Sequence, residues 1–249
     1  MLLASDKKRV YSCTTLIELT VIDTLLALLP LLIGIGIFYW QLNKATELTT
    51  AGARMVLQLA AIGYLLTFLF EYDQDWIGLL VLTFMLMVAA WIGIRPQIKK
   101  CSRTYALALV SIFIGGGLNL AWILLVVLEL DPWYQPRMVI PLAGMVFSVA
   151  MNSISVAIER FEHELINNPE NAQRAAINAA TISHVNTLLA VGLVSLPGMM
   201  TGQILSGTSP LIAVRYQIMV MSMLVGTSTL VLCIYFYLRK KLIRTGGGG

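Results

Sequence analysis

Long apolar runs, separated by short charged segments, are the feature of this sequence that most limits its fold. An α-helix needs about 20 predominantly apolar residues to cross a bilayer. Seven runs of that kind are evident, at about residues 16–40, 50–70, 76–94, 105–128, 138–158, 176–197 and 212–238. They predict an all-α fold, a polytopic transmembrane helical bundle with a single transmembrane domain over residues 1–245 and a glycine tail at 246–249.

Composition narrows the class of protein in the same direction. The chain is 58% hydrophobic and 12% charged, whereas soluble domains average about 45–50% and about 25%. This excludes a soluble enzyme and a disordered chain. It also argues against a nucleic-acid partner, which would need a basic face on a polar domain. The three cysteines, Cys13, Cys101 and Cys233, have no disulfide or zinc spacing.

The distribution of lysine and arginine predicts the orientation. With seven alternating spans, twelve of the 17 cations fall on one side and five on the other. Cytoplasmic loops carry the excess of Lys and Arg, so we expect the N-terminus outside and the C-terminus in the cytoplasm. Lys7, Lys8 and Arg9 oppose this locally, while the later loops agree.

Polar and small residues inside two spans are candidates for a translocation path, because hydrocarbon offers them no water. In 138–158, Gly144, Ser148 and Asn152 share one helix face, and Pro141 falls in the first turn. Helix packing alone is the alternative interpretation. In 176–197, His184 could relay a proton, bind a metal, or simply bond a neighbouring helix. Its span also carries a further set of polar side chains, namely Asn178, Thr181, Ser183, Asn186 and Thr187.

The segment after that span contains the strongest break in the apolar pattern. Prolines and glycines interrupt residues 195–210, which favours a gate or re-entrant turn, or else a glycine-rich outer loop. The gate candidates are Pro197, Gly198, Met199, Met200 and Gly202. Methionines here and at 219, 221 and 223 could bind a soft metal, although ordinary packing is the preferred interpretation of them. The metal ligands stay unknown at this stage.

Two polar regions are candidates for coupling to a cytoplasmic partner. Residues 159–175 form either a short helix under the membrane or a solvated connector, with a turn signal at Asn168-Pro169. Arg54 and Gln58 lie one turn apart near the start of 50–70, where Arg54 could snorkel to the interface or hold the loops. The coupling candidates are Arg54, Gln58, Asn168, Pro169, Glu170 and Arg174.

Several motifs of catalysis are missing from the sequence. It has no P-loop, no H-E-x-x-H and no G-x-S-x-G. Its spans carry few acids, which ion-coupled transporters usually need. We therefore expect a transport subunit that is not itself an enzyme, with no catalytic residues and no cofactor in this chain, and with its energy supplied by a partner.

Three stretches resemble one family. VGLVSLPGMMTGQILSGTSPLIAVRYQIMVM (191–221), GARMVLQLAAIGYLL (52–66) and IPLAGMVFSVAMNS (140–153) look like the FetB-type ABC permeases, which include iron exporters and plant aluminium-tolerance half-transporters. The resemblance covers roughly residues 20–240. The matching positions are Arg54, Gln58, Gly63, Tyr64, Pro141, Gly144, Met145, Met151, Asn152, Pro197, Gly198, Met199, Met200, Gly202, Tyr216 and Gln217.

The resemblance implies a permease in the cell (inner) membrane that exports metal ions, with iron as the main expected cargo. It also implies a partner, a separate cytoplasmic P-loop ATPase that binds the ATP. A homodimer of permease subunits would complete it. The loop at 159–175 looks shorter than in that family, and Ser148-Val149 replace its Gly-Asn. Two alternatives therefore stay open, a degenerate regulatory or binding membrane protein of the same fold, and an ion-coupled carrier or channel.

Overall fold

The computed structural model describes residues 20–42, 45–72, 75–97, 102–131 and 134–246. These residues form helices joined by turns and irregular connections, with one isolated bridge between Val191 and Ser195. The all-α prediction is therefore confirmed. The chain divides into two compact units: residues 1–72 with 202–209, and residues 73–201 with 210–249. The single domain expected over residues 1–245 stays a prediction.

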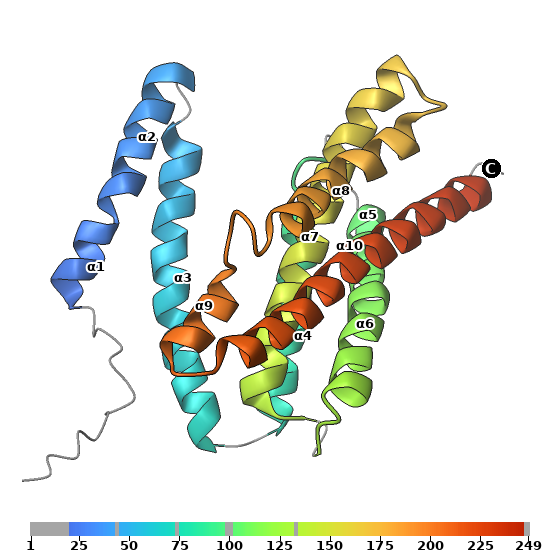
Figure 1. Ribbon diagram of the computed structural model, residues 1–249. Helices are drawn as coiled ribbons and strands as arrows, with labels where there is room; N and C mark the ends of the chain where they lie inside the picture. The colour runs from blue at the N-terminus through green and yellow to red at the C-terminus, as the bar shows by residue number, and fades with distance from the viewer. Residues whose placement is uncertain (1–19, 43–44, 73–74, 98–101, 132–133, 247–249) are drawn as a thin grey trace, which may run out of the picture. The chain divides into compact units, whose positions relative to one another are not determined.

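The first unit contains three consecutive helices, α1 (Val21–Ala27), α2 (Leu29–Leu42) and α3 (Ala45–Tyr72) (Figure 1). A capping box starts α1, since the Thr20 hydroxyl accepts from the Asp23 N–H and the Asp23 carboxylate accepts from the Thr20 N–H. Helices α2 and α3 pack on each other, with Leu31 lying against Gly52. Most of their apolar side chains are exposed, as expected of helices that face lipid.

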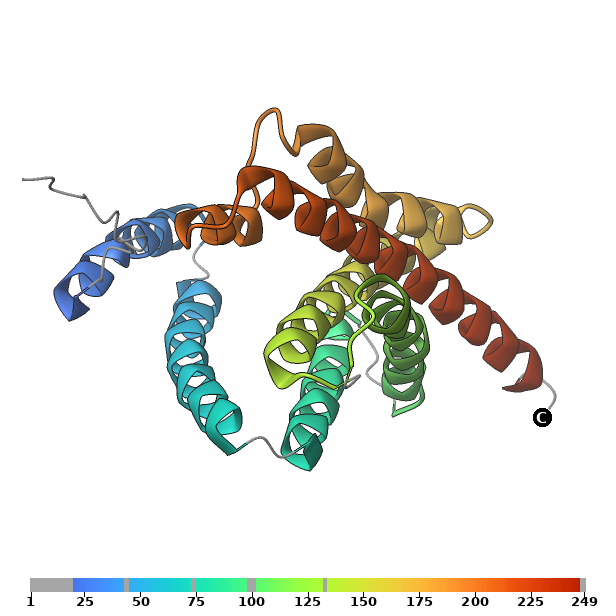
Figure 2. The ribbon, with the colours of Figure 1, turned by 60° about the horizontal axis from the view of Figure 1, so that its bottom comes forward.

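The second unit is built around α7 (Pro136–Asn167), which packs on α4 (Asp75–Gly93), α8 (Ala172–Ala190) and α10 (Pro210–Gly246). Figures 1 and 2 show α7 and α8 side by side as a hairpin that α10 crosses. Small residues line the centre of α7, and Ala143, Ala150 and Ala157 are fully buried there. Such residues allow helix backbones to approach closely in a membrane.

A fifth helix of this unit is wound irregularly. It runs through α5 (Ser102–Ser111), the π-helical turn η1 (Ile112–Gly116), α6 (Gly117–Trp122) and the π-helical turn η2 (Ile123–Val127). Gly115 lies in η1, where a Cβ atom would come within 3.1 Å of three Val231 atoms, including the backbone nitrogen. The glycine therefore permits a close crossing of this helix with α10.

Five helical segments among the described residues are long and apolar enough to cross a membrane: Ile22–Trp40, Trp76–Gly93, Ser102–Val127, Pro136–Asn167 and Pro210–Leu242. The predicted runs 50–70 and 176–197 coincide with α3 and α8, which are helices but are not among these five. For α8 the reason is visible in its polar side chains. The chain is thus a helical membrane protein, while the count of seven stays a prediction.

Three local predictions are corrected. Residues 159–167 are neither a separate helix nor a connector, because α7 continues without a break to Asn167 and only 168–171 form the turn. Pro141 lies inside α7 rather than in its first turn, since the helix already starts at Pro136. The span predicted to reach 197 ends as α8 at Ala190, where Gly192 takes a positive φ of 82° in the turn that follows.

Candidate functional site

A buried hydrogen-bonded cluster joins three helices of the second unit. The Ser153 Oγ of α7 lies 3.1 Å from the His184 Nε2 of α8 and 2.8 Å from the Ser228 Oγ of α10. Both serines are 1% exposed, and His184 is half-buried. Buried hydroxyls need such partners, because an unsatisfied polar group in a low-dielectric interior is costly.

A second polar contact adjoins the first. The Asn119 Nδ2 of α6 donates to the Met223 carbonyl oxygen at 2.6 Å and to the Thr227 Oγ1 at 2.8 Å. Thr227 is fully buried and precedes Ser228 in α10. We call these five residues, Asn119, Ser153, His184, Thr227 and Ser228, the polar seam.

The polar seam lies near the middle of its longest helices. Ser228 is the central residue of α10, equally far along the chain from Pro210 and from Gly246. Ser153 is close to the centre of α7, slightly nearer to Asn167 than to Pro136. Both residues fall within helical segments that are long and apolar enough to cross a membrane. Polar groups in such segments are rare, and they mark pathways or relays when they occur.

The sequence found one of these five residues and missed four. The hydrogen bond expected between His184 and a neighbouring helix exists, and its partner is Ser153. The path candidate Asn152, next to Ser153 in the chain, is exposed. Ser153, Thr227 and Ser228 resemble ordinary small residues in an apolar span. The one sequence signal that could have indicated them is a Ser or Thr beside an Asn or Gly within an apolar span, as in MNS (151–153) and GTS (226–228).

The other path candidates in the second unit are not assembled into one cluster. Gly144 faces α4, where a Cβ atom would lie 3.2 Å from the Met85 methyl carbon, and Ser148 is exposed. Thr181 and Thr187 donate to carbonyls of their own helix. Met223 is buried in the apolar core, and Met199 and Met219 pack against it, which agrees with the packing interpretation of these methionines.

The segment predicted as a gate contains a short helix, α9 (Gly198–Leu205). Residues 191–197 before it and 206–209 after it are irregular, and Gly207 has a φ of 91°. Pro197, Gly198, Met199 and Met200 belong to the second unit, and Gly202 belongs to the first. Their role as a gate stays a prediction.

The coupling candidates fall in both units. Arg54 and Gln58 are exposed on α3 in the first unit. Asn168, Pro169 and Glu170 form the tip of the α7–α8 hairpin, and Arg174 lies in the first turn of α8. All four are exposed. The Asn168 N–H closes α7 by donating to the Glu164 carbonyl at 2.7 Å, and Pro169 then prevents further helix.

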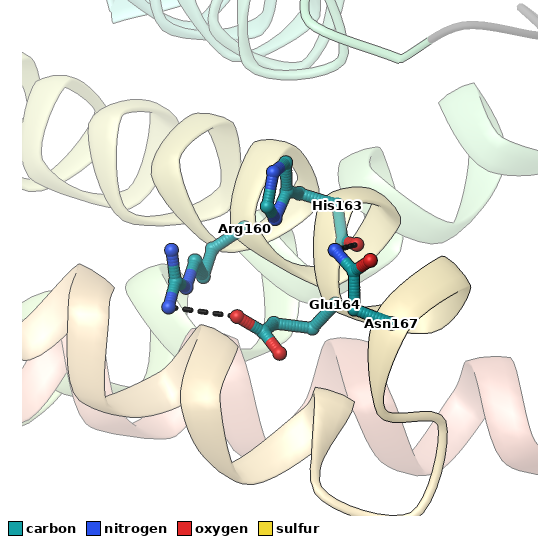
Figure 3. Close-up of polar contacts among 4 residues, drawn as sticks. All are labelled: Arg160, His163, Glu164 and Asn167. Carbon is teal, nitrogen blue, oxygen red and sulfur yellow. Dashed lines mark hydrogen bonds and ion pairs between the residues drawn. The ribbon is translucent and has the colours of Figure 1, made fainter.

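The end of α7 is held by contacts that the sequence did not reveal. Arg160 and Glu164 form an ion pair of 2.7 Å one turn apart, and Asn167 donates to the His163 carbonyl (Figure 3). The Arg239 guanidinium of α10 lies 4.1 Å from the centroid of the Phe161 ring. Such cation–π contacts contribute about 0.5–1 kcal/mol at exposed sites. Figure 3 shows Arg160 and Glu164 on the same side of the helix.

The helices and the polar seam define a polytopic α-helical membrane protein with buried polar groups between its helices. Comparison with known proteins gives its family. A model of the uncharacterised protein family UPF0014 matches residues 21–175 and 167–243. The chain belongs to the UPF0014 family, and the predicted resemblance is thereby confirmed, since its relatives include proteins named "Probable iron export permease protein FetB" and "Protein ALUMINUM SENSITIVE 3".

Relatives cover most of the chain. It is 38% identical over 216 residues to the UPF0014 membrane protein slr1647 of Synechocystis, covering 79% of this chain and 83% of that protein. It is 30% identical over 233 residues to the probable iron export permease protein FetB of Escherichia coli (86% and 88%). It is 33% identical over 221 residues to the protein ALUMINUM SENSITIVE 3 of Arabidopsis thaliana (82% and 80%). No solved structure matches it.

Proposed function

We propose that this chain is the transmembrane permease subunit of an ABC transporter in the cell (inner) membrane. A separate cytoplasmic ATPase binds and hydrolyses the ATP. The cargo is a metal ion, and iron is the metal that we propose. The chain crosses the membrane seven times, with its N-terminus outside and its C-terminus in the cytoplasm. Two copies form the working unit, since an ABC transporter needs two ATP sites. A relative named "Probable iron export permease protein FetB" supports the cargo.

The α7–α8 hairpin carries this proposal. Helix α7 has 32 residues, so at 1.5 Å per residue it is about 48 Å long, well beyond the hydrocarbon thickness of about 30 Å. Its last turns are polar, and its tip is exposed. A helix of this kind extends out of the membrane, and its end offers a docking point to a soluble partner.

The hairpin also connects the tip to the polar seam. Ser153 lies about four turns before the end of α7, and His184 lies about three turns after the start of α8. Both positions are therefore about 20 Å from the tip along paired helices. A movement imposed on the tip by an ATPase would be transmitted along the hairpin to the buried hydroxyls, without any flexible link in between.

The test reverses two charges at the tip and measures the bound ATPase. The double variant Glu170→Lys/Arg174→Glu should reduce the ATPase that co-purifies with the chain roughly tenfold, which corresponds to about 1.4 kcal/mol of binding. Arg215→Glu makes the same kind of change near the start of α10 and should leave the yield unchanged. Equal yields would remove the hairpin from docking.

Two results would favour the alternatives. If no P-loop ATPase co-purifies at all, and a longer loop grafted at 165–175 restores none, the proposal loses its energy source and a regulatory membrane protein becomes the better interpretation. If transport persists without nucleotide, a carrier or channel becomes the better interpretation. Cellular metal content after removal of both genes tests the cargo separately from the permease.

A further inference from the structure

We propose that His184 is a reversible proton-binding site between α7, α8 and α10, with the hydroxyls of Ser153 and Ser228 as its built-in partners. This goes beyond the permease assignment and does not depend on it. The observation behind it is the linear chain His184 Nε2, Ser153 Oγ, Ser228 Oγ, with links of 3.1 and 2.8 Å.

The hydroxyl chain can serve both charge states of the ring. A serine hydroxyl donates one hydrogen bond and accepts two. When Nε2 is unprotonated, Ser153 donates to it and accepts from Ser228. When Nε2 carries a proton, the ring donates to Ser153, which in turn donates to Ser228. Two rotating hydroxyls therefore keep the buried bonds with either neutral tautomer and with the charged ring.

The second ring nitrogen is available for the exchange. In the described part of the chain, Nδ1 of His184 has no hydrogen-bond partner, and the side chain is half-buried rather than sealed. In the neutral tautomer that carries its proton on Nε2, Nδ1 is the basic atom, so Nδ1 can take up the second proton while the Nε2–H stays bonded to Ser153.

Other charged groups lie at a distance along all three helices. On α7, the charged residues nearest to Ser153 in the chain are Arg137 and Glu159. On α8, the charged residue nearest to His184 is Arg174. On α10, the charged residues nearest to Ser228 are Arg215 and Arg239. Glu159 is six residues from Ser153, about 9 Å along the axis. The other titratable groups of α10 are Tyr216, Cys233, Tyr235, Tyr237 and, beyond Arg239 towards its C-terminal end, Lys240, Lys241 and Arg244. His184 thus has no fixed counter-charge close by along these helices, and binding a proton changes the charge of this region by one full unit.

That change has a direct consequence for a cation passing nearby. An imidazolium repels a cation, and at low effective dielectric this repulsion is strong over a few ångströms. Binding and release of a proton at His184 would therefore alternate this part of the bundle between cation-tolerant and cation-excluding states.

The chain has only two histidines, so a single substitution leaves one imidazole to observe. His163 is exposed, and its backbone carbonyl accepts the hydrogen bond from Asn167, so His163→Gln keeps that contact. The variant is labelled with ¹⁵N-histidine and reconstituted in lipid nanodiscs, with a chelator present. The ¹⁵N shifts are followed between about pH 5 and pH 8, where histidines change charge.

We expect one imidazole that passes from the neutral to the charged shift pattern. Ser153→Ala should move its midpoint by about one pH unit, because a hydrogen bond to a charged ring is stronger than one to a neutral ring. Ser155→Ala, a matched change on the same helix, should not move it. If Ser153→Ala does not fold, Ser228→Ala cuts the next link and should also move the midpoint.

Two results would overturn the proposal. One is a spectrum that stays unchanged over the whole pH range. The other is a midpoint that is the same with and without the hydroxyl of Ser153 or Ser228.

Discussion

At the scale of single residues, one amide links two helices of the second unit. Asn119 lies between two π-helical turns and donates to both a carbonyl and a hydroxyl of α10. Turns of π-helix are uncommon and often occur at functional sites. An amide that bonds a backbone carbonyl of another helix fixes the register between the two helices more tightly than apolar contacts do.

Replacing this amide should loosen the α6–α10 contact. Asn119→Leu removes both hydrogen bonds, and interhelical bonds of this kind contribute about 0.6–1.7 kcal/mol in membranes. We expect a loss of that size in the free energy of unfolding in mild detergent. Asn186→Leu, at an exposed position of α8, is the control. A loss that is no larger for Asn119 than for Asn186 would contradict the role assigned to the amide.

At the scale of elements, close helix crossings depend on glycines at particular positions. At Gly115, a Cβ atom would lie 2.9 Å from a Val231 methyl carbon and 3.0 Å from its backbone nitrogen. Two residues further along the same helix, Gly117 has nothing within 4 Å of that position. In this run of three glycines, Gly115 therefore faces α10 at close range, whereas Gly117 faces open space. The two differ only in the direction in which they point around the helix.

Alanine at these two positions should give opposite results. Gly115→Ala forces η1 and α10 apart, and overpacking of this kind costs about 1–3 kcal/mol. Gly117→Ala meets no neighbour and should be neutral or stabilise slightly, because alanine favours helix over glycine by up to about 1 kcal/mol. Thermal unfolding of both variants, side by side, measures the difference. Equal effects would mean that the crossing is looser than the structure shows.

At the scale of the whole molecule, the orientation in the membrane decides what each surface can do. The hairpin tip can meet an ATPase only if residues 168–171 lie in the cytoplasm. The positive-inside pattern predicts that side for the tip, and the opposite side for residues 206–209.

Labelling of single cysteines should show these two locations. In a chain with Cys13, Cys101 and Cys233 changed to serine, Ser206→Cys should react with a membrane-impermeant maleimide in intact cells. Glu170→Cys should react only after the membrane is opened. Both positions are exposed, so reactivity reports the side of the membrane. The reverse pattern would invert the proposed topology and exclude docking at the tip.

The sequence by itself determined the helical class of this protein, its membrane location and its family. Apolar runs of span length follow from chain composition, and the bilayer requires backbone hydrogen bonds to be satisfied within each helix. The seven runs were therefore found as helices, although their ends shifted where polar residues continued α7 to Asn167 and where α8 stopped at Ala190. The first shift occurs in a segment for which the sequence left a helix and a connector open, and the second occurs just before Gly192, which takes a positive φ.

Only the tertiary structure decided which polar residues act together. Asn152 and Ser153 are neighbours in the sequence, yet one is exposed and the other bonds His184 and Ser228. Residues that follow each other in a helix point about 100° apart, and the sequence does not show where the neighbouring helices lie. The partners of Ser153 are 31 and 75 residues away in the chain, so the polar seam exists only once α7, α8 and α10 are packed.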